Sequence, residues 1–245
     1  VATPGRLMDL LEQKAIDLSN IKTVVLDEAD EMLSMGFKQD IEKILEYTTG
    51  DRKLWLFSAT IPRGIQEIIT EFMAPDAHKI EVDAKQKVNQ SIAHHYVIVD
   101  LKDKVDVLSA YLKRRAKQSG IIFCNTKAGS QKLARELKDK GFPVGLLHGD
   151  MGQRDREKEM RMFKSKRLQI LVATDVSARG LDVADLGFVI HFQLPDQQEY
   201  FTHRSGRTAR AGKSGVSLAL VAPSELESIE VLEEQLNISF EQMFL

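Results

Sequence analysis

Short runs of β-branched and aromatic residues alternate along the chain with longer segments in which apolar residues recur at helical spacing. The short runs predict strands over residues 22–27, 53–58, 78–82, 94–99, 120–124, 144–147, 168–173, 187–191 and 216–221. The segments between them predict helices over residues 6–14, 37–47, 62–73, 103–117, 127–140, 152–165, 197–204 and 223–235. Strands that alternate with helices in this way are typical of an α/β fold with a mostly parallel sheet.

The chain is long enough for two hydrophobic cores, because its 245 residues exceed the roughly 100 to 150 residues of a typical domain. Residues 83–91 are polar and show no apolar period, which is typical of a linker. We therefore expect a first domain over residues 1–82 and a second domain over residues 92–245.

Composition excludes several classes of protein. The hydrophobic share of 43% and the charged share of 29% are typical of globular domains and argue against a disordered or fibrous chain. No apolar run approaches the roughly 18 residues that cross a bilayer, so we expect no membrane span. The single cysteine, Cys124, excludes an intramolecular disulfide and a multi-cysteine zinc site. This cysteine usage fits a reducing, cytoplasmic location.

Charge is distributed unevenly along the chain. The net charge of −2 gives no reason by itself to expect nucleic-acid binding. Of the 34 basic and 36 acidic residues, 9 basic and 15 acidic ones lie in residues 1–82, which leaves 25 and 21 in residues 83–245. The second part of the chain is therefore the basic part.

A cluster of acids, Asp27-Glu28-Ala29-Asp30, follows the apolar run 23–26. The carboxyl ends of strands are where α/β sheets bind ligands. An Asp there can hold Mg²⁺ on the phosphates of a nucleotide, and the adjacent Glu can orient and deprotonate the attacking water. The alternative is that these acids only stabilise the positive end of a following helix.

A nucleotide site of this kind needs a phosphate-binding loop, and the chain contains no G-x-x-x-x-G-K-[ST] pattern. The segment Gly212-Lys213-Ser214 comes nearest, but Gly206 is one residue too distant and a strand follows. A phosphate loop normally follows an early strand of such a domain. Because the chain also starts without an initiating Met or a signal-like segment, we expect the loop in a missing N-terminal segment of the first domain.

A block of arginines lies near the end of the second part, in the segment His203-Arg204-Ser205-Gly206-Arg207-Thr208-Ala209-Arg210. The arginines are three residues apart, so one helical turn can aim them together. Guanidinium groups suit the charge that develops on a transferred phosphate. A solvated basic face is the alternative, above all for Arg204, although the glycines indicate a close approach of the backbone.

Together these segments resemble the two-domain core of the DEAD-box RNA helicases over almost the whole chain. The matching elements are, in order, Thr3 to Arg6, Asp27 to Asp30, Ser58-Ala59-Thr60, Ile121 to Thr126, Gln153 with Arg156, Ala173 to Asp182, and His203 to Arg210. The resemblance implies two RecA-like parallel-sheet domains, of which the first is incomplete.

The resemblance also implies roles around ATP and Mg²⁺. Asp27 would hold Mg²⁺ through water, Glu28 would be the hydrolytic base, and Arg207 and Arg210 would reach the γ-phosphate from the second domain. Asp182 would accept hydrogen bonds from the ribose, although it could instead be a turn-forming residue.

Four residues would couple the nucleotide to RNA in this family: Asp30, Ser58, Thr60 and His203. Asp30 and His203 would bridge the two domains. Thr60 also precedes Ile61-Pro62, where it could cap a helix.

RNA contacts in the family are made to the backbone, without reading the bases. The resemblance assigns them to Thr3, Gly5, Arg6, Asn125, Thr126, Gln153, Arg156 and Thr174. Residues 153–167 carry seven basic and three acidic side chains, which fits an RNA-facing edge or a solvated helix. Trp55 and the phenylalanines lie at periodic apolar positions and are expected in the core, and His94-His95 is expected to be structural.

The chain is thus expected to belong to an ATP-dependent RNA helicase that separates short duplexes or remodels RNA–protein complexes, with ribonucleoprotein components as further partners. Without its phosphate loop the chain alone is expected to be inactive. A DNA-directed helicase of the same superfamily and a noncatalytic RNA clamp or adaptor are the alternatives. The literal Asp-Glu-Ala-Asp and Ser-Ala-Thr argue against the first, and Glu28, Arg207 and Arg210 argue against the second.

Overall fold

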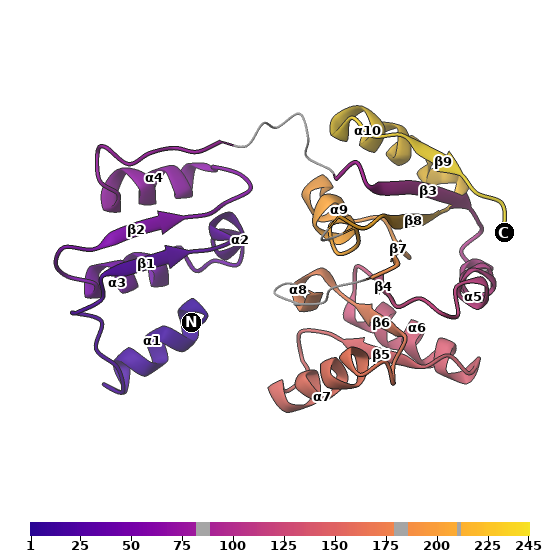
Figure 1. Ribbon diagram of the computed structural model, residues 1–245, viewed down its shortest axis with the longest axis horizontal. Helices are drawn as coiled ribbons and strands as arrows, with labels where there is room; N and C mark the ends of the chain where they lie inside the picture. The colour runs from indigo at the N-terminus through magenta and orange to yellow at the C-terminus, as the bar shows by residue number, and fades with distance from the viewer. Residues whose placement is uncertain (82–88, 179–185, 210–211) are drawn as a thin grey trace. The chain divides into compact units, whose positions relative to one another are not determined.

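The computed structural model describes residues 1–81, 89–178, 186–209 and 212–245 (Figure 1). The chain divides into two compact units, Val1–Glu81 and Val82–Leu245. Each unit contains its own sheet, and every strand pairing in the described residues is parallel. The predicted α/β class with parallel sheets is therefore confirmed.

The first unit is built on a sheet of two strands, β1 (Thr23–Leu26) and β2 (Lys53–Leu56). Its helices are α1 (Pro4–Glu12), α2 (Ala29–Ser34), α3 (Lys38–Tyr47) and α4 (Arg63–Phe72). The core holds Leu26 of β1 together with Ile41 and Leu45 of α3 and Ile65 and Ile68 of α4. Helices α3 and α4 are amphipathic, so each can contribute an apolar stripe to this core.

One face of this small sheet is exposed. Val25 and Trp55 are register partners, and with Phe57 they are 55%, 52% and 53% exposed. Side chains alternate between the faces of a strand, so these residues lie opposite Val24, Leu54 and Leu56, which pack against the core. The prediction that Trp55 lies in the core is wrong, and the same holds for Phe57.

The second unit is a sheet of seven parallel strands in the order β5-β6-β4-β7-β8-β3-β9. Its strands are β3 (Ile92–Ile98), β4 (Gly120–Phe123), β5 (Val144–Leu147), β6 (Ile170–Ala173), β7 (Phe188–His191), β8 (Gly215–Val221) and β9 (Phe240–Gln242). Its helices are α5 (Lys104–Arg114), α6 (Lys127–Asp139), α7 (Gln153–Lys164), α8 (Asp175–Ala178), α9 (Gln198–Ser205) and α10 (Leu226–Leu236), with a 3₁₀ turn over Pro223–Glu225.

Helices cover both faces of this sheet. The register aligns Ile122, Val172 and Ile190 on one face, where α5 and α6 pack. It aligns Ile121, Leu171 and Val189 on the other face, where Phe163 of α7 packs. Strands buried on both faces read as continuous apolar runs, which is why β4, β6 and β7 were predictable from the sequence.

The structure corrects several predicted elements. Residues 78–81 form no strand, although a strand was predicted over 78–82, and residue 82 lies outside the described residues. Residues 83–88 of the expected linker also lie outside the described residues. Helices α2 and α8 and strand β9 were not predicted, because segments of three to six residues are too short to show a period. No helix in the described ranges is long and apolar enough to cross a membrane.

His94 of β3 is enclosed by aromatic rings in the second unit. Its ring centroid lies 5.6 Å from that of Phe201 and 5.5 Å from that of Phe240. Within the described part of the chain, neither ring nitrogen has a hydrogen-bond partner. Burial, and to a smaller extent the neighbouring His95, lowers the pKa of His94 from 6.5 to about 4. This environment fits the structural role expected for His94.

We predict that acid destabilises the second unit through this residue. The folded-state pKa of His94 lies below the unfolded value, so its contribution to stability is complete above pH 6.5 and is lost as the pH falls toward 4. In urea unfolding at pH 7 and pH 5, His94→Phe should lose less stability between the two values than the unmodified chain. Some loss should remain, because burial also lowers the pKa of His191.

His78→Gln serves as the matched control, since His78 is exposed. An equal loss in the unmodified chain and in His94→Phe would contradict the prediction.

Candidate functional site

The candidate hydrolytic acids of the first unit lie where β1 turns into α2. Asp27 and Glu28 follow the last residue of β1 and are both exposed. The backbone of Glu28 is left-handed, with φ 52° and ψ 45°, which costs a residue other than glycine on the order of 1 kcal/mol. The Asp27 carboxylate accepts the N–H of Glu28 at 3.0 Å. Among the described residues, neither carboxylate is neutralised by an ion pair, so both can face a ligand.

Three other predicted residues of this unit, Asp30, Ser58 and Thr60, meet in one hydrogen-bond network. Thr60 donates to Asp30 Oδ2 through its N–H and its Oγ1, both at 2.9 Å. Ser58 Oγ accepts the N–H of Asp30 at 3.1 Å and donates to the carbonyl of Thr60 at 2.6 Å. Partial burial would raise the pKa of Asp30, but the hydrogen bonds outweigh it and hold the pKa below its usual value.

This network ties the ends of β1 and β2 together. The backbone adds two bonds, from Phe57 N–H to the carbonyl of Leu26 at 2.8 Å and from Ala29 N–H to that of Phe57 at 3.1 Å. The alternative role of Thr60 as a helix cap is wrong, because Pro62 is the N-cap of α4. The helix-terminal role of the acids holds in part, since Asp30 and Glu31 lie in the first turn of α2.

The candidate RNA residues of the first unit lie at the start of α1. Thr3 is the N-cap of this helix, which begins at Pro4, two residues before its predicted start. Gly5 and Arg6 lie in the first turn, and Arg6 is ion-paired with Asp9. The first N–H groups of a helix have no partner within it and favour anions such as phosphate.

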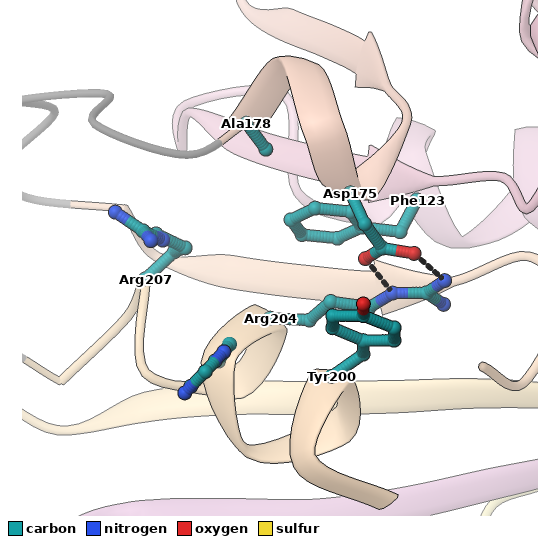
Figure 2. A pocket seen from close by; sticks show the side chains of 7 residues that line it. Phe123, Asp175, Ala178, Tyr200, Arg204 and Arg207 are labelled. Atoms are coloured by element: carbon teal, nitrogen blue, oxygen red, sulfur yellow. Dashed lines mark hydrogen bonds and ion pairs between the residues drawn. The ribbon is translucent and has the colours of Figure 1, made fainter. Parts of the chain in front are cut away.

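In the second unit, one arginine organises the carboxyl edge of the sheet (Figure 2). Arg204 of α9 is only 1% exposed. Its Nε and Nη2 donate to the two carboxylate oxygens of Asp175 at 2.6 and 2.7 Å. Its remaining donors reach the carbonyl of Gln193 at 2.8 Å and Oδ1 of Asn125 at 2.9 Å. The alternative of a solvated basic face is therefore wrong for Arg204.

A small hollow opens beside this ion pair. It is lined by Phe123, Asp175, Ala178, Tyr200, His203, Arg204 and Arg207. Figure 2 shows Arg207 set apart from the Arg204–Asp175 pair. Arg204 and Arg207 line the same hollow but do not share a helical turn as expected, because α9 ends at Ser205. Asp182 and Arg210, the other expected nucleotide ligands, lie outside the described residues.

The candidate RNA residues of the second unit follow the carboxyl ends of β4 and β6 or begin α7. Asn125 and Thr126 are used internally, since Asn125 Nδ2 donates to the carbonyl of Leu194 at 2.9 Å and Thr126 Oγ1 caps α6. Ser177 contacts two further candidate residues, Arg156 and Thr174. Its carbonyl accepts a hydrogen bond from Arg156 at 2.7 Å, and its hydroxyl lies 3.2 Å from Thr174 Oγ1. Gln153 Nε2 donates to Glu157 on the exposed surface of α7.

Several further polar residues lie at the same edge, and the sequence pattern assigned no role to them. His148 follows β5, and its Nε2 lies 3.0 Å from Nε2 of Gln131. Lys127 pairs with Asp150 at 2.5 Å. Asp175, the partner of Arg204, was likewise given no role of its own. The available signal was position, because each of these segments follows a strand end in a parallel sheet.

Two family models match the chain. The model of the DEAD/DEAH box helicases matches residues 1–68. The model described as the helicase conserved C-terminal domain matches residues 103–212. The two matches fall in the first and second units, respectively.

Individual proteins of known sequence agree with these matches. A probable ATP-dependent RNA helicase of Methanocaldococcus jannaschii is 40% identical over 243 residues, which are 99% of this chain and 65% of that protein. The DEAD-box ATP-dependent RNA helicase CshA of Bacillus subtilis is 39% identical, over 99% of this chain and 49% of CshA. The chain thus spans about half to two thirds of the length of these relatives.

Solved structures give the same result. Dbp5 of S. cerevisiae bound to RNA and ADP BeF3 has a TM-score of 0.90 and 30% identity, covering 99% of this chain and 64% of that chain. A DEAD box protein from the hyperthermophile Methanococcus jannaschii has a TM-score of 0.59 and 39% identity, covering 100% and 66%. From these matches and the Asp27–Asp30 and Ser58–Thr60 geometry, the chain belongs to the family of DEAD-box ATP-dependent RNA helicases.

Proposed function

We propose that this chain supplies the hydrolytic acids, the coupling network and the second RecA-like domain of an ATP-dependent RNA helicase. The whole protein would separate short RNA duplexes or remodel RNA–protein complexes. The observation that carries this proposal is the exposed Asp27–Glu28 pair, held at a strained turn directly beside the Asp30–Ser58–Thr60 network. Strained backbone persists only where the surrounding structure maintains it, and such positions are concentrated at functional sites.

The acids fit a hydrated Mg²⁺ ion. Mg²⁺ keeps several waters and is bound through one or two carboxylates together with substrate phosphates, and Asp27 and Glu28 are two exposed carboxylates without an ion pair among the described residues. In this proposal Asp27 would hold the ion through water, and the bound ion would supply neutralisation of phosphate charge. Glu28 orients the attacking water and accepts its proton.

The second unit supplies cations to the same chemistry. Arg207 and Arg210 stabilise the charge that develops on the γ-phosphate, and Asp182 accepts hydrogen bonds from the ribose. Arg204 acts as a positioning residue, because its bonds to Asp175 and Asn125 fix the end of α9 from which Arg207 follows. Hydrolysis then requires the two units to close on the nucleotide.

Coupling to RNA follows from the network in the first unit. A displacement of Asp27 or Glu28 would be transmitted to Thr60 through Asp30, because the Asp30 carboxylate accepts hydrogen bonds from both donors of Thr60. His203 lines the hollow of the second unit. In this proposal His203 would contact Asp30 only when the two units have closed on the nucleotide. Thr3, Gly5, Arg6, Asn125, Thr126, Gln153, Arg156 and Thr174 would hold or position the RNA backbone.

A polypeptide of residues 1–245 should show negligible ATPase activity. Its sequence contains no phosphate loop to anchor the β- and γ-phosphates against Asp27 and Glu28. The measurement is phosphate release with and without RNA. The control is the same chain joined to the N-terminal segment of the M. jannaschii relative, which should be active. RNA-stimulated hydrolysis by residues 1–245 alone would disprove the need for that loop.

In the joined protein, Arg207→Ala should lower ATP turnover by about 10³-fold, because an arginine acts on the transition-state charge. Glu28→Gln should also abolish most turnover, since the amide cannot accept the proton. Binding of a non-hydrolysable ATP analogue should persist in both variants.

Arg167→Ala and Glu31→Gln are the controls, one for each type of side chain, and both should keep near-normal turnover. Normal turnover in Arg207→Ala would reduce that residue to a surface cation. The same result in Glu28→Gln would exclude it as the base.

Binding of the joined protein to nucleic acid should depend on salt and little on base sequence, since the proposed contacts reach only the backbone. RNA should stimulate its ATPase more than DNA of the same sequence, because the 2′-hydroxyl and A-form geometry distinguish the two. The measurement compares matched single strands at two salt concentrations.

Two outcomes would favour the alternatives. Equal stimulation by DNA would indicate a DNA-directed helicase. Strong, nucleotide-independent RNA binding by the second unit, without ATPase activity in the joined protein, would indicate a clamp.

A further inference from the structure

A basic hollow lies near the amino end of β4, the end of this strand that is remote from Asn125 and Thr126. It is formed by the end of α5 and the segment that leads to Gly120, the first residue of β4. Its volume is about 550 Å³, and it is lined by Tyr111, Lys113, Arg114, Arg115, Ala116, Lys117, Gln118, Met243 and Leu245. Residues 107–118 contain four cations and no acid. Figure 1 shows α5 and the end of the chain at this side of the second unit.

Three of these cations are exposed and without an acidic partner. Lys113, Arg114 and Lys117 form no ion pair or side-chain hydrogen bond in the described residues. Stabilisation of the negative end of α5 explains Lys113 and Arg114, which lie in its last turn. It does not explain Lys117, which lies beyond the helix, or the hollow itself.

Tyr111 adds an unsatisfied donor. This residue is only 2% exposed and lines the hollow, and its hydroxyl has no hydrogen-bond partner of good geometry within the described chain. The Arg115 guanidinium lies 5.0 Å from the centre of its ring, but an arginine can only donate, so the hydroxyl proton still lacks an acceptor. Burial raises the pKa of Tyr111 to about 12, which keeps the proton in place at neutral pH.

The Tyr111 hydroxyl can donate to any acceptor, and the neighbouring cations favour an acceptor with negative charge. A buried hydroxyl without a partner costs about 1 to 3 kcal/mol, and a phosphate oxygen would satisfy it while pairing with the cations. Arginine forks and lysine ammonium groups both suit phosphate. No exposed aromatic side chain lines the hollow, because Tyr111 is buried, so bases have no surface on which to stack.

We propose that this hollow binds the phosphate backbone of an RNA segment that extends beyond the contacts at the carboxyl edge of the sheet. The inference rests on the proposed RNA-binding function. The three exposed cations are spread over the last turn of α5 and the segment after it, which suits a chain of phosphates better than a single compact anion. A four-residue strand such as β4 spans only about 13 Å, so a few nucleotides can pass from one edge to the other.

The test uses the whole 245-residue chain and two single-stranded RNAs of 8 and 25 nucleotides. The variant Lys113→Ala/Arg114→Ala/Lys117→Ala removes the exposed cations of the hollow. The control variant Lys132→Ala/Arg135→Ala/Lys138→Ala removes the same residue types and the same charge from the exposed face of α6. Thermal melting of each variant checks that folding is unchanged.

The 25-mer should bind the hollow variant more weakly than the control variant, whereas the 8-mer should bind both equally. The slope of log affinity against log salt for the 25-mer should become shallower by about 2, from three lost contacts at about 0.7 each. Tyr111→Phe should weaken the binding of the 25-mer without changing this slope. The proposal is overturned if the hollow and control variants bind the 25-mer alike, or if tripolyphosphate occupies the hollow without competing with the 25-mer.

The two RNA lengths distinguish a failure of this inference from a failure of the proposed function. If the unmodified chain binds neither RNA, the proposed RNA-binding function fails. If it binds both and only the length-dependent difference between the variants is absent, the inference about the hollow fails alone.

Discussion

The bond between Arg204 and Asp175 is the constraint on which the carboxyl edge of the second unit depends. A guanidinium that is 1% exposed is stable only when its donors are satisfied. Here Asp175, Asn125 and the carbonyl of Gln193 accept from it. These partners belong to α8, to the loop after β4 and to the loop after β7. Loss of Asp175 would leave the buried charge of Arg204 unpaired, at a cost of about 3 to 5 kcal/mol. Arg204 thus fixes three segments to α9 at once.

Within four residues, the first unit holds one hydrogen-bonded carboxylate and two exposed ones. Asp30 is partly buried, and both of its oxygens accept hydrogen bonds, from Thr60 and from the N–H of Glu31. Asp27 and Glu28 are exposed at the same strand end. Because the bonded acid holds the turn, the exposed acids can keep their charge directed at solvent or a ligand. The left-handed Glu28 is maintained by this framework and by the backbone bonds between β1 and β2.

The sequence predicted what depends on local pattern, and it failed where burial depends on tertiary contacts. Strands β4 and β6 contain no polar residue, and β7 contains only His191, because both faces of these strands are covered. The resemblance marked Asp30, Ser58 and Thr60 as coupling residues, but their shared network follows from the pairing of β1 with β2. Trp55 looked equally apolar, yet it lies on the exposed face of a two-stranded sheet. Arg204 looked like a surface cation, because its buried partners are 11 to 79 residues away in sequence.

The charge asymmetry between the two parts of the chain gives a physical reason for dividing the chemistry. The first unit presents Asp27 and Glu28, whose charges would repel the phosphates of the proposed nucleotide. Attraction must therefore come from other groups. The arginines that follow α9 lie in the part that holds 25 basic and 21 acidic residues, out of 34 and 36 in the whole chain. A base that must stay ionised and cations that stabilise phosphate would neutralise each other if they were permanently paired. In the proposed mechanism, placing these charges on separate units would leave Glu28 without a permanent cationic partner and able to accept a proton.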